Sequence, residues 1–296
     1  MRREVVIGAS GLIGGYVLRD ALMGGAQAMG TYCAHQRPGL KRLDIGDQGG
    51  LGQFLEDEQP SVVYLAAALP NVDWVEDHPE ESARVNVTGA LALISRLRGS
   101  KATLVYYSSD YVFDGRTGPY VEEDEPDPVN EYGRQKLAVE RAIQRQLDNW
   151  LILRVTVVYG WEPLRKNFVQ RSVSELRSGG RVQAPVDQFG NPTYAPDLAR
   201  ASRELVRKPA RGLFHLVGEA RTCRYELALE MAQVFELPCD LIRPVRTSSL
   251  KQRARRPLEG GMVVDKARAV LGRPLMSYSD GLRRMRDEEG ILDGCR

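Results

Sequence analysis

The chain has 296 residues, with 41 Lys and Arg set against 39 Asp and Glu, so its formal net charge is +2. This near balance gives no reason to expect a nucleic acid or a membrane surface as partner, and a hydrophobic fraction of 43% excludes a disordered or fibrous chain. Four scattered cysteines and three histidines form no metal-binding or disulfide pattern, so we expect no metal site, reduced thiols and a cytoplasmic location.

Short apolar runs alternate with longer helical patterns through the first half of the chain. In chain order, we expect strands at 5–7, 28–32, 61–66, 102–107 and 151–155, and helices at 12–24, 49–58, 80–98 and 131–147. Strands that alternate with helices predict βαβ units, and therefore an α/β fold with a mostly parallel, doubly wound sheet. After about residue 160, prolines divide the chain into shorter pieces. No apolar stretch approaches the roughly 18–20 residues that a membrane span needs.

The turn between the first strand and the first helix is rich in glycine. Its G-x-x-G-x-x-G pattern is a variant of the dinucleotide-binding fingerprint, which needs a tight bend and close approach of the backbone to a pyrophosphate. The following helix N-terminus offers free N–H groups and a positive dipole end to the phosphates. A glycine turn that serves packing alone is the alternative. The cofactor-binding residues expected in this turn are Gly8, Ser10, Gly11, Leu12, Ile13 and Gly14.

The segment after the second strand bears on the choice between NAD and NADP. A protein that binds NAD generally places an Asp or Glu there, where it accepts a hydrogen bond from the ribose 2′-OH. Here residues 31–37 read T-Y-C-A-H-Q-R, and the next carboxylate is Asp44. Arg37, helped by His35, is instead suited to pair with a 2′-phosphate through charge-assisted hydrogen bonds. We therefore expect NADP(H) as the cofactor, and expect Arg37→Ala to lose much of the preference for NADPH.

Tyr132 is the only one of twelve tyrosines with a lysine, Lys136, four residues further on. This spacing puts both side chains on one helix face, near the carboxyl edge of the sheet where doubly wound folds bind ligands. We expect the ammonium to lower the phenol pKa, so that Tyr132 acts as general acid toward a carbonyl oxygen while hydride arrives from a nicotinamide. A hydroxyl of Ser108 or Ser109, at the end of the neighbouring strand, would polarise that carbonyl. A surface Tyr–Lys contact and a serine cap are the structural alternatives.

With these motifs the sequence resembles the extended short-chain dehydrogenase/reductases, and more closely the dTDP-4-dehydrorhamnose reductase family. The resemblance runs through nearly the whole chain, and its most specific part is Y-S-S-D-Y-V-F-D-G at 107–115 followed by Y-G-R-Q-K at 132–136. We therefore expect an NADP-binding Rossmann domain over 1–158 and a smaller C-terminal α/β substrate-binding lobe over 159–296. Part of about 182–218 is expected to return to the Rossmann sheet.

The resemblance also implies roles for individual residues. The catalytic triad would be Ser109, Tyr132 and Lys136, with serine where the family commonly has threonine. Tyr132 and Lys136 would also contact the cofactor, whose groove is implied to contain Asp44, Ile45, Ala66, Ala67, Ala68 and Tyr107. The residues implied to face the substrate are Ser109, Asp110, Val157 and Arg256. Arg256 would meet the diphosphate, and Val157, where the family has a tryptophan near the sugar, would leave a smaller wall.

The activity implied by the resemblance is an NADPH-dependent reduction of a nucleotide-linked 4-keto-6-deoxy sugar at C4. The basic stretch 243–256 then has phosphates to meet, whereas the acidic stretch 122–127 is expected to be a solvated loop. The expected partner is a small nucleotide sugar, and the sequence leaves a homodimer open. Two alternatives also stay open: an NADP-binding regulatory subunit resembling the methionine adenosyltransferase β subunit, and a nucleotide-sugar epimerase. A dehydratase is disfavoured, because no Asp-Glu pair follows Ser109.

Overall fold

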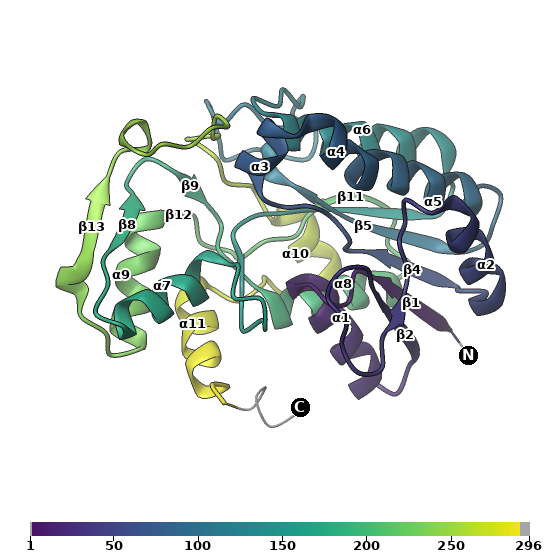
Figure 1. The fold of residues 1–296 in the computed structure, drawn as a ribbon, viewed down its shortest axis with the longest axis horizontal. Helices are drawn as coiled ribbons and strands as arrows, with labels where there is room; N and C mark the ends of the chain where they lie inside the picture. The colour runs from purple at the N-terminus through teal and green to yellow at the C-terminus, as the bar shows by residue number, and fades with distance from the viewer. Residues whose placement is uncertain (1, 291–296) are drawn as a thin grey trace.

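The computed structural model describes residues 2–290, and its larger part is built on a seven-stranded sheet (Figure 1). The strand order is β11-β6-β5-β4-β1-β2-β3, and every neighbouring pair is parallel. The strands are β1 (Arg3–Ile7), β2 (Gln27–Tyr32), β3 (Lys41–Arg42), β4 (Val62–Leu65), β5 (Thr103–Ser109), β6 (Trp150–Val155) and β11 (Gly212–His215). The order reverses between β1 and β4, the place where such sheets bind ligands. The predicted doubly wound α/β fold is confirmed.

Helices cover both faces of the sheet. One face carries α1 (Leu12–Met23), α8 (Ala195–Arg207) and α10 (Asp265–Leu271), and the other carries α2 (Gln48–Glu58), α5 (Ala90–Leu97) and α6 (Glu131–Gln146). Val62 and Tyr64 of β4 pack into the first core, whereas Val63 and Leu65 pack into the second. This two-sided burial explains why β4 is continuously apolar.

The expected helix 80–98 is divided into three parts. α4 (Pro79–Ala83) leads into a π-helical turn, η1 (Arg84–Gly89), before α5 begins. Asn86 lies in this turn, where its amide oxygen accepts from the N–H of Leu69 at 2.8 Å and its amide nitrogen donates to Gln135 of α6 at 2.9 Å. The wide turn thus holds the segment after β4 against α6, in keeping with the frequent use of π-bulges near functional sites.

The second half of the chain also forms a separate core around three helices, α7 (Phe168–Arg177), α9 (Arg224–Val234) and α11 (Tyr278–Asp287). These helices pack with the parallel pair β8 (Val182–Pro185) and β13 (Ile242–Val245). The remaining short elements are α3 (Val72–Asp77), β7 (Val158–Tyr159), β9 (Phe189–Gly190), β10 (Thr193–Tyr194), β12 (Thr222–Cys223), η2 (Asp110–Val112), η3 (Cys239–Leu241) and η4 (Thr247–Ser249). The division of the chain into two domains at residue 158 stays a prediction.

A buried ion pair ties the sheet to the helices on one face. Arg203 of α8 donates to both carboxylate oxygens of Glu4 in β1, at 2.9 and 3.0 Å, and also to Asp20 of α1.

Within residues 2–290, no helix is long and apolar enough to cross a membrane.

Candidate active site

The glycine turn between β1 and α1 is tightly packed against the segment after β4. Gly8 has a φ of +89°, and a Cβ atom there would lie 2.6 Å from the backbone nitrogen of Ala67. A Cβ at Gly14 would lie 2.4 Å from the carbonyl oxygen of Gly8. Gly11, the N-cap of α1, provides no side chain to bond the first N–H groups of the helix. The turn therefore keeps a bare backbone and a helix N-terminus available for an anion, which fits the phosphates of a dinucleotide.

Arg37 reaches this turn from the loop after β2. Its Nη2 donates to the carbonyl oxygen of Ser10 at 2.6 Å, which brings the guanidinium beside the turn. Its pairing with a 2′-phosphate stays a prediction. Burial lowers the pKa of Arg37, and the carboxylate of Glu162 opposes that shift.

The residues expected around the adenosine lie near the same edge of the sheet. Ala66 follows β4 directly and donates to the carbonyl oxygen of Ile7, and Ala67 packs against Gly8. The exposed Asp44 accepts from the N–H of Gly46 at 2.8 Å, and Ile45 is buried. The structure therefore places the Ala66–Ala68 segment beside the glycine turn, and their contact with a cofactor stays a prediction.

Tyr132 and Lys136 lie in the first two turns of α6. Asn130 caps this helix by accepting from the N–H of Gly133 at 2.9 Å. Lys136 is buried and donates to the carbonyl oxygen of Tyr107 in β5 at 2.8 Å, with its Nζ 5.6 Å from the centre of the Tyr132 ring. The structure thus brings the pair to the carboxyl end of β5, as the spacing predicted.

Burial shifts the pKa values of both groups. It lowers the pKa of Lys136 to about 8, although the carboxylate of Glu140 acts in the opposite direction. Burial raises the pKa of the Tyr132 phenol, and Asp110 and Tyr111 raise it further. The phenol pKa is therefore raised rather than lowered as expected, because desolvation is the largest influence on it. A neutral phenol is nevertheless the form that donates a proton to a carbonyl oxygen.

Ser109 ends β5 and is bonded to its neighbour. Its Oγ donates to Asp110 Oδ1 at 3.1 Å and accepts from the N–H of Tyr111 at 3.2 Å. The other Asp110 oxygen accepts from Thr156 Oγ1 at 2.7 Å. Burial raises the pKa of Asp110, and the bonds from Thr156 and Ser109 oppose this shift. The ring of Tyr111, two residues after Ser109, meets that of Tyr132 edge-on, with centroids 5.9 Å apart, so the end of β5 lies against the start of α6.

The substrate-side residues come from two further segments. Val157 adopts a left-handed φ of +46°, which is uncommon for a β-branched residue and strains the backbone there.

Arg256 pairs with Asp73 of α3 at 2.9 Å and donates to the carbonyl oxygen of Ala254 at 2.7 Å. Asn130 donates to the carbonyl oxygen of Arg255 at 2.8 Å. The end of the basic stretch is therefore docked at the N-terminus of α6, next to Tyr132.

Arg224 is a site residue that the sequence analysis missed. It is the first residue of α9, and its guanidinium lies 5.3 Å from the centre of the Phe168 ring. Burial raises the pKa of both Asp110 and Tyr111, and the positive charge of Arg224 opposes this rise, as does Arg256 for Tyr111. Both guanidinium groups thus lie near the Tyr111 phenol. No sequence motif marks Arg224, because its place near Asp110 and Tyr111 depends on how the core that contains α9 packs in the folded chain.

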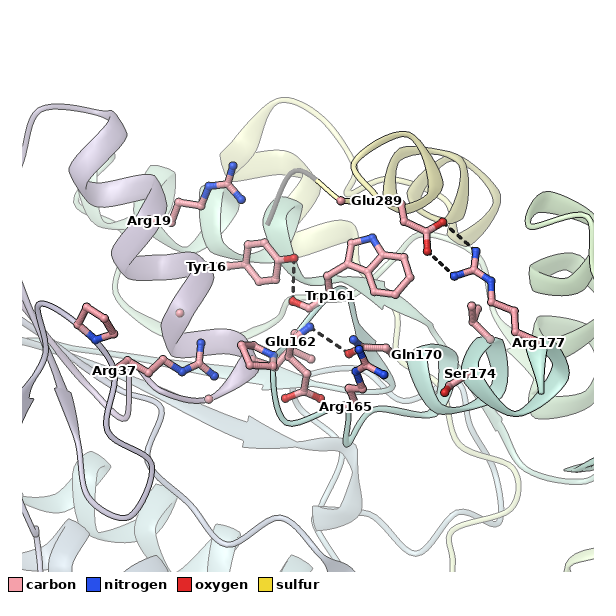
Figure 2. Close-up of a pocket in the computed structure, with 17 residues that line it drawn as sticks. Tyr16, Arg19, Arg37, Trp161, Glu162, Arg165, Gln170, Ser174, Arg177 and Glu289 are labelled. Atoms are coloured by element: carbon pink, nitrogen blue, oxygen red, sulfur yellow. Dashed lines mark hydrogen bonds and ion pairs between the residues drawn. The ribbon is translucent and has the colours of Figure 1, made fainter. Parts of the chain in front are cut away.

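A cavity of about 650 Å³ adjoins the phosphate turn (Figure 2). It is bounded by the start of α1, the loop after β2, the loop after β7, the helix α7 and the end of α11. Its charged lining residues are Arg19, Arg37, Glu162, Arg165, Arg177 and Glu289. The lining includes Gly11 and Leu12 but neither Tyr132 nor Ser109, so the cavity flanks the phosphate end of the site.

A family model, described as the RmlD substrate binding domain, matches residues 2–290. The chain belongs to this family. The predicted relation to the dTDP-4-dehydrorhamnose reductases is confirmed by this match and by the solved structures that resemble the chain.

Within the described residues, no group of three or more His, Cys, Asp or Glu could hold a metal ion.

Two solved structures share the fold. A hypothetical dTDP-4-dehydrorhamnose reductase from Sulfolobus tokodaii is 30% identical, with a TM-score of 0.85 over 95% of this chain and 99% of that one. A dTDP-4-dehydrorhamnose reductase from Bacillus anthracis, solved in complex with NADP, is 24% identical, with a TM-score of 0.88 over 97% of this chain and 100% of that one.

Two relatives carry different functional names. Methionine adenosyltransferase 2 subunit beta from Bos taurus is 33% identical over 264 residues, which span 86% of this chain and 78% of that protein. A probable low-salt glycan biosynthesis reductase from Haloferax volcanii is 31% identical over 284 residues, which span 94% of this chain and 95% of that protein. The family therefore includes named reductases and a named enzyme subunit.

Proposed function

We propose that this protein is an NADPH-dependent reductase of a nucleotide-linked 4-keto-6-deoxy sugar. The observation that best supports the proposal is that Tyr132 and Lys136 of α6 pack against the carboxyl end of β5, the strand that Ser109 ends, in a chain whose glycine turn has no room for a Cβ at Gly8 or Gly14. The Bacillus anthracis relative in complex with NADP and the reductases among the relatives support it.

Each residue of the site has a separate task in this reaction. When bound, NADPH supplies the hydride for C4 of the sugar. Ser109 orients the carbonyl oxygen by a hydrogen bond, and Tyr132 donates the proton that this oxygen needs. Lys136, already held by the carbonyl oxygen of Tyr107, keeps a positive charge near the phenol and lowers the energy of the phenolate that remains. Arg224 and Arg256 are suited to the diphosphate of the substrate.

Tyr132→Phe tests the role of the phenol. We expect turnover to fall by at least about 10²-fold, since the general acid is lost, while the dissociation constant for NADPH stays within about twofold. The assay follows NADPH oxidation at 340 nm against a panel of nucleotide-linked 4-keto sugars, and Tyr111→Phe serves as a control for a neighbouring phenol. Near-normal turnover in Tyr132→Phe would refute the assignment.

A second candidate function is a regulatory subunit that binds NADP, favoured by the identity to methionine adenosyltransferase 2 subunit beta. It predicts that the chain co-elutes with a methionine adenosyltransferase catalytic subunit in size-exclusion chromatography and oxidises no NADPH with any sugar of the panel. An epimerase, the remaining alternative, would convert a nucleotide sugar without net NADPH consumption. The cytoplasmic location and the homodimer stay predictions.

A further inference from the structure

The cavity beside the phosphate turn has more positive than negative side chains. Four arginines and two glutamates line it. Arg177 donates to the two carboxylate oxygens of Glu289 through Nη1 and Nη2, so these two charges already match one another. Glu162 is buried, and its Oε1 accepts from the N–H groups of Lys166 and Asn167 at 3.0 and 2.8 Å. Three arginines, Arg19, Arg37 and Arg165, then stand against the single carboxylate of Glu162, so the net charge of the lining is positive.

Arg165 is one of two lining cations, with Arg19 of α1, for which the described residues provide no hydrogen-bond or ion-pair partner. Among residues 2–290 its guanidinium has no hydrogen-bond or ion-pair partner, and the side chain is exposed. Its φ of +49° lies in the left-handed region that non-glycine residues seldom adopt. Figure 2 shows Arg37 extending toward Glu162 from the loop after β2, and Arg165 on the loop after β7. The two guanidinium groups thus reach one cavity from different segments of the chain.

The loop that carries Arg165 is fixed at its base. The phenol of Tyr16 in α1 donates to the carbonyl oxygen of Trp161 at 3.0 Å, and the Trp161 indole donates to the carbonyl oxygen of Met285 at 2.6 Å. Glu162 then holds the far end of the loop through Lys166 and Asn167. A loop anchored in this way presents Arg165 to the cavity with little loss of backbone entropy on binding.

We propose that Arg165 binds the 2′-phosphate of NADPH together with Arg37, so that the loop after β7 contributes to the preference for NADPH. This inference rests on the proposed function, because it takes NADPH as the cofactor. A 2′-phosphate carries a charge of about −1.5 to −2 at neutral pH, which suits two guanidinium groups better than one. The pyrophosphate would be held by the backbone N–H groups that begin α1, at the end of the cavity lined by Gly11 and Leu12.

The test compares dissociation constants for NADPH and NADH by fluorescence titration of the whole chain. We expect Arg165→Ala to weaken NADPH binding about tenfold and to leave NADH binding within about twofold, because only NADPH has the 2′-phosphate. Arg165→Lys, which keeps the charge, should recover part of the loss. Lys166→Ala is the matched control, since it removes a neighbouring exposed charge that does not line the cavity.

Two results would overturn the inference: unchanged NADPH binding in Arg165→Ala, or equal losses for NADPH and NADH, which would place Arg165 at the pyrophosphate instead. Failure of this inference is distinguishable from failure of the proposed function. If the unaltered protein binds neither nucleotide, the function itself is contradicted. If it binds NADPH and the Arg165→Ala variant binds it equally well, only the role of Arg165 is contradicted.

Discussion

Lys136 carries an ammonium group in a buried position between α6 and β5. Its side chain donates to the carbonyl oxygen of Tyr107 and lies over the ring of Tyr106 at 4.9 Å. These contacts do not replace the lost hydration fully, and burial lowers its pKa from 10.5 to about 8. Lys136 therefore keeps its proton at neutral pH but loses it above about pH 8, so its positive charge near the phenol depends on pH.

The lowered pKa makes folding stability depend on pH. Between about pH 8 and 10.5 the unfolded lysine keeps its proton while the folded lysine has lost it, so the contribution of Lys136 to the free energy of unfolding increases with pH. Relative to Lys136→Met, the unaltered protein should gain about 3 kcal/mol between pH 7 and 10.5. Urea unfolding of both proteins across this range measures the difference. A difference independent of pH would contradict the lowered pKa.

At the scale of elements, two glycines of the turn between β1 and α1 have different tasks, one in packing and one in ligand binding. A Cβ at Gly14 would collide with the Gly8 carbonyl, whereas a Cβ at Gly11 would lie 3.5 Å from the same oxygen, an ordinary contact. Both glycines belong to the sequence pattern, so the pattern alone could not distinguish their tasks. The structure predicts that Gly14 serves packing and that Gly11 serves approach to the phosphates.

Alanine substitutions test this distinction. Gly14→Ala should destabilise the protein by about 1–3 kcal/mol through overpacking. Gly11→Ala should lower stability by less than about 1 kcal/mol, as for a replaced N-cap glycine, yet weaken NADPH binding at least about tenfold, because its methyl group would face the pyrophosphate. Urea unfolding and fluorescence titration supply the two readouts. Unaltered NADPH binding in Gly11→Ala would favour a turn that serves packing alone.

A buried ion pair joins α6 to β6 behind Lys136. Glu140 accepts from Arg154 Nε and Nη2 at 3.1 and 2.8 Å, and the two side chains are only 1% and 3% exposed. The guanidinium also lies 4.8 Å from the centre of the Phe113 ring, in the segment that follows Ser109. The pair therefore fixes the helix that carries Lys136 against the strand beside β5.

Removing one partner of this pair leaves the other charge buried and unmatched. Glu140→Gln should lower the free energy of unfolding by about 3–5 kcal/mol, whereas a Glu140→Leu, Arg154→Met double variant should lose much less. Urea unfolding checks both values. Equal losses in the single and double variants would show that packing, rather than the unmatched charge, determines the effect.

Over the whole molecule, the sequence predicted the features that depend on neighbouring residues. The alternation of strands and helices, the glycine turn and the Tyr132–Lys136 spacing are all local patterns, and each lies at the expected edge of the sheet. Features that depend on tertiary packing were missed. Thr156 bonds Asp110 only because β6 lies beside β5, and Arg224 faces Tyr111 only because α9 packs nearby.

The upward shift of the Tyr132 pKa was also missed, because it depends on tertiary packing. The sequence placed a lysine beside the phenol, but the extent of burial depends on several elements that close around it.

The net charge of the molecule also conceals local differences, since Arg224, Arg256 and the arginines of the cavity gather where phosphates are expected. An overall charge of +2 gives no reason to expect a polyanionic partner and is compatible with a site for small phosphorylated ligands.

The central claim, hydride transfer to C4 of a nucleotide-linked sugar with protonation by Tyr132, is tested most directly by isotope transfer. The protein is incubated with NADPH that carries deuterium at the transferred position of the nicotinamide and with a nucleotide-linked 4-keto-6-deoxy sugar, and the product is analysed by NMR. We expect deuterium at C4 of the product, formed in step with NADPH oxidation and lost in Tyr132→Phe. A product without deuterium at C4, or NADPH that stays unoxidised with every sugar of the panel, would contradict it.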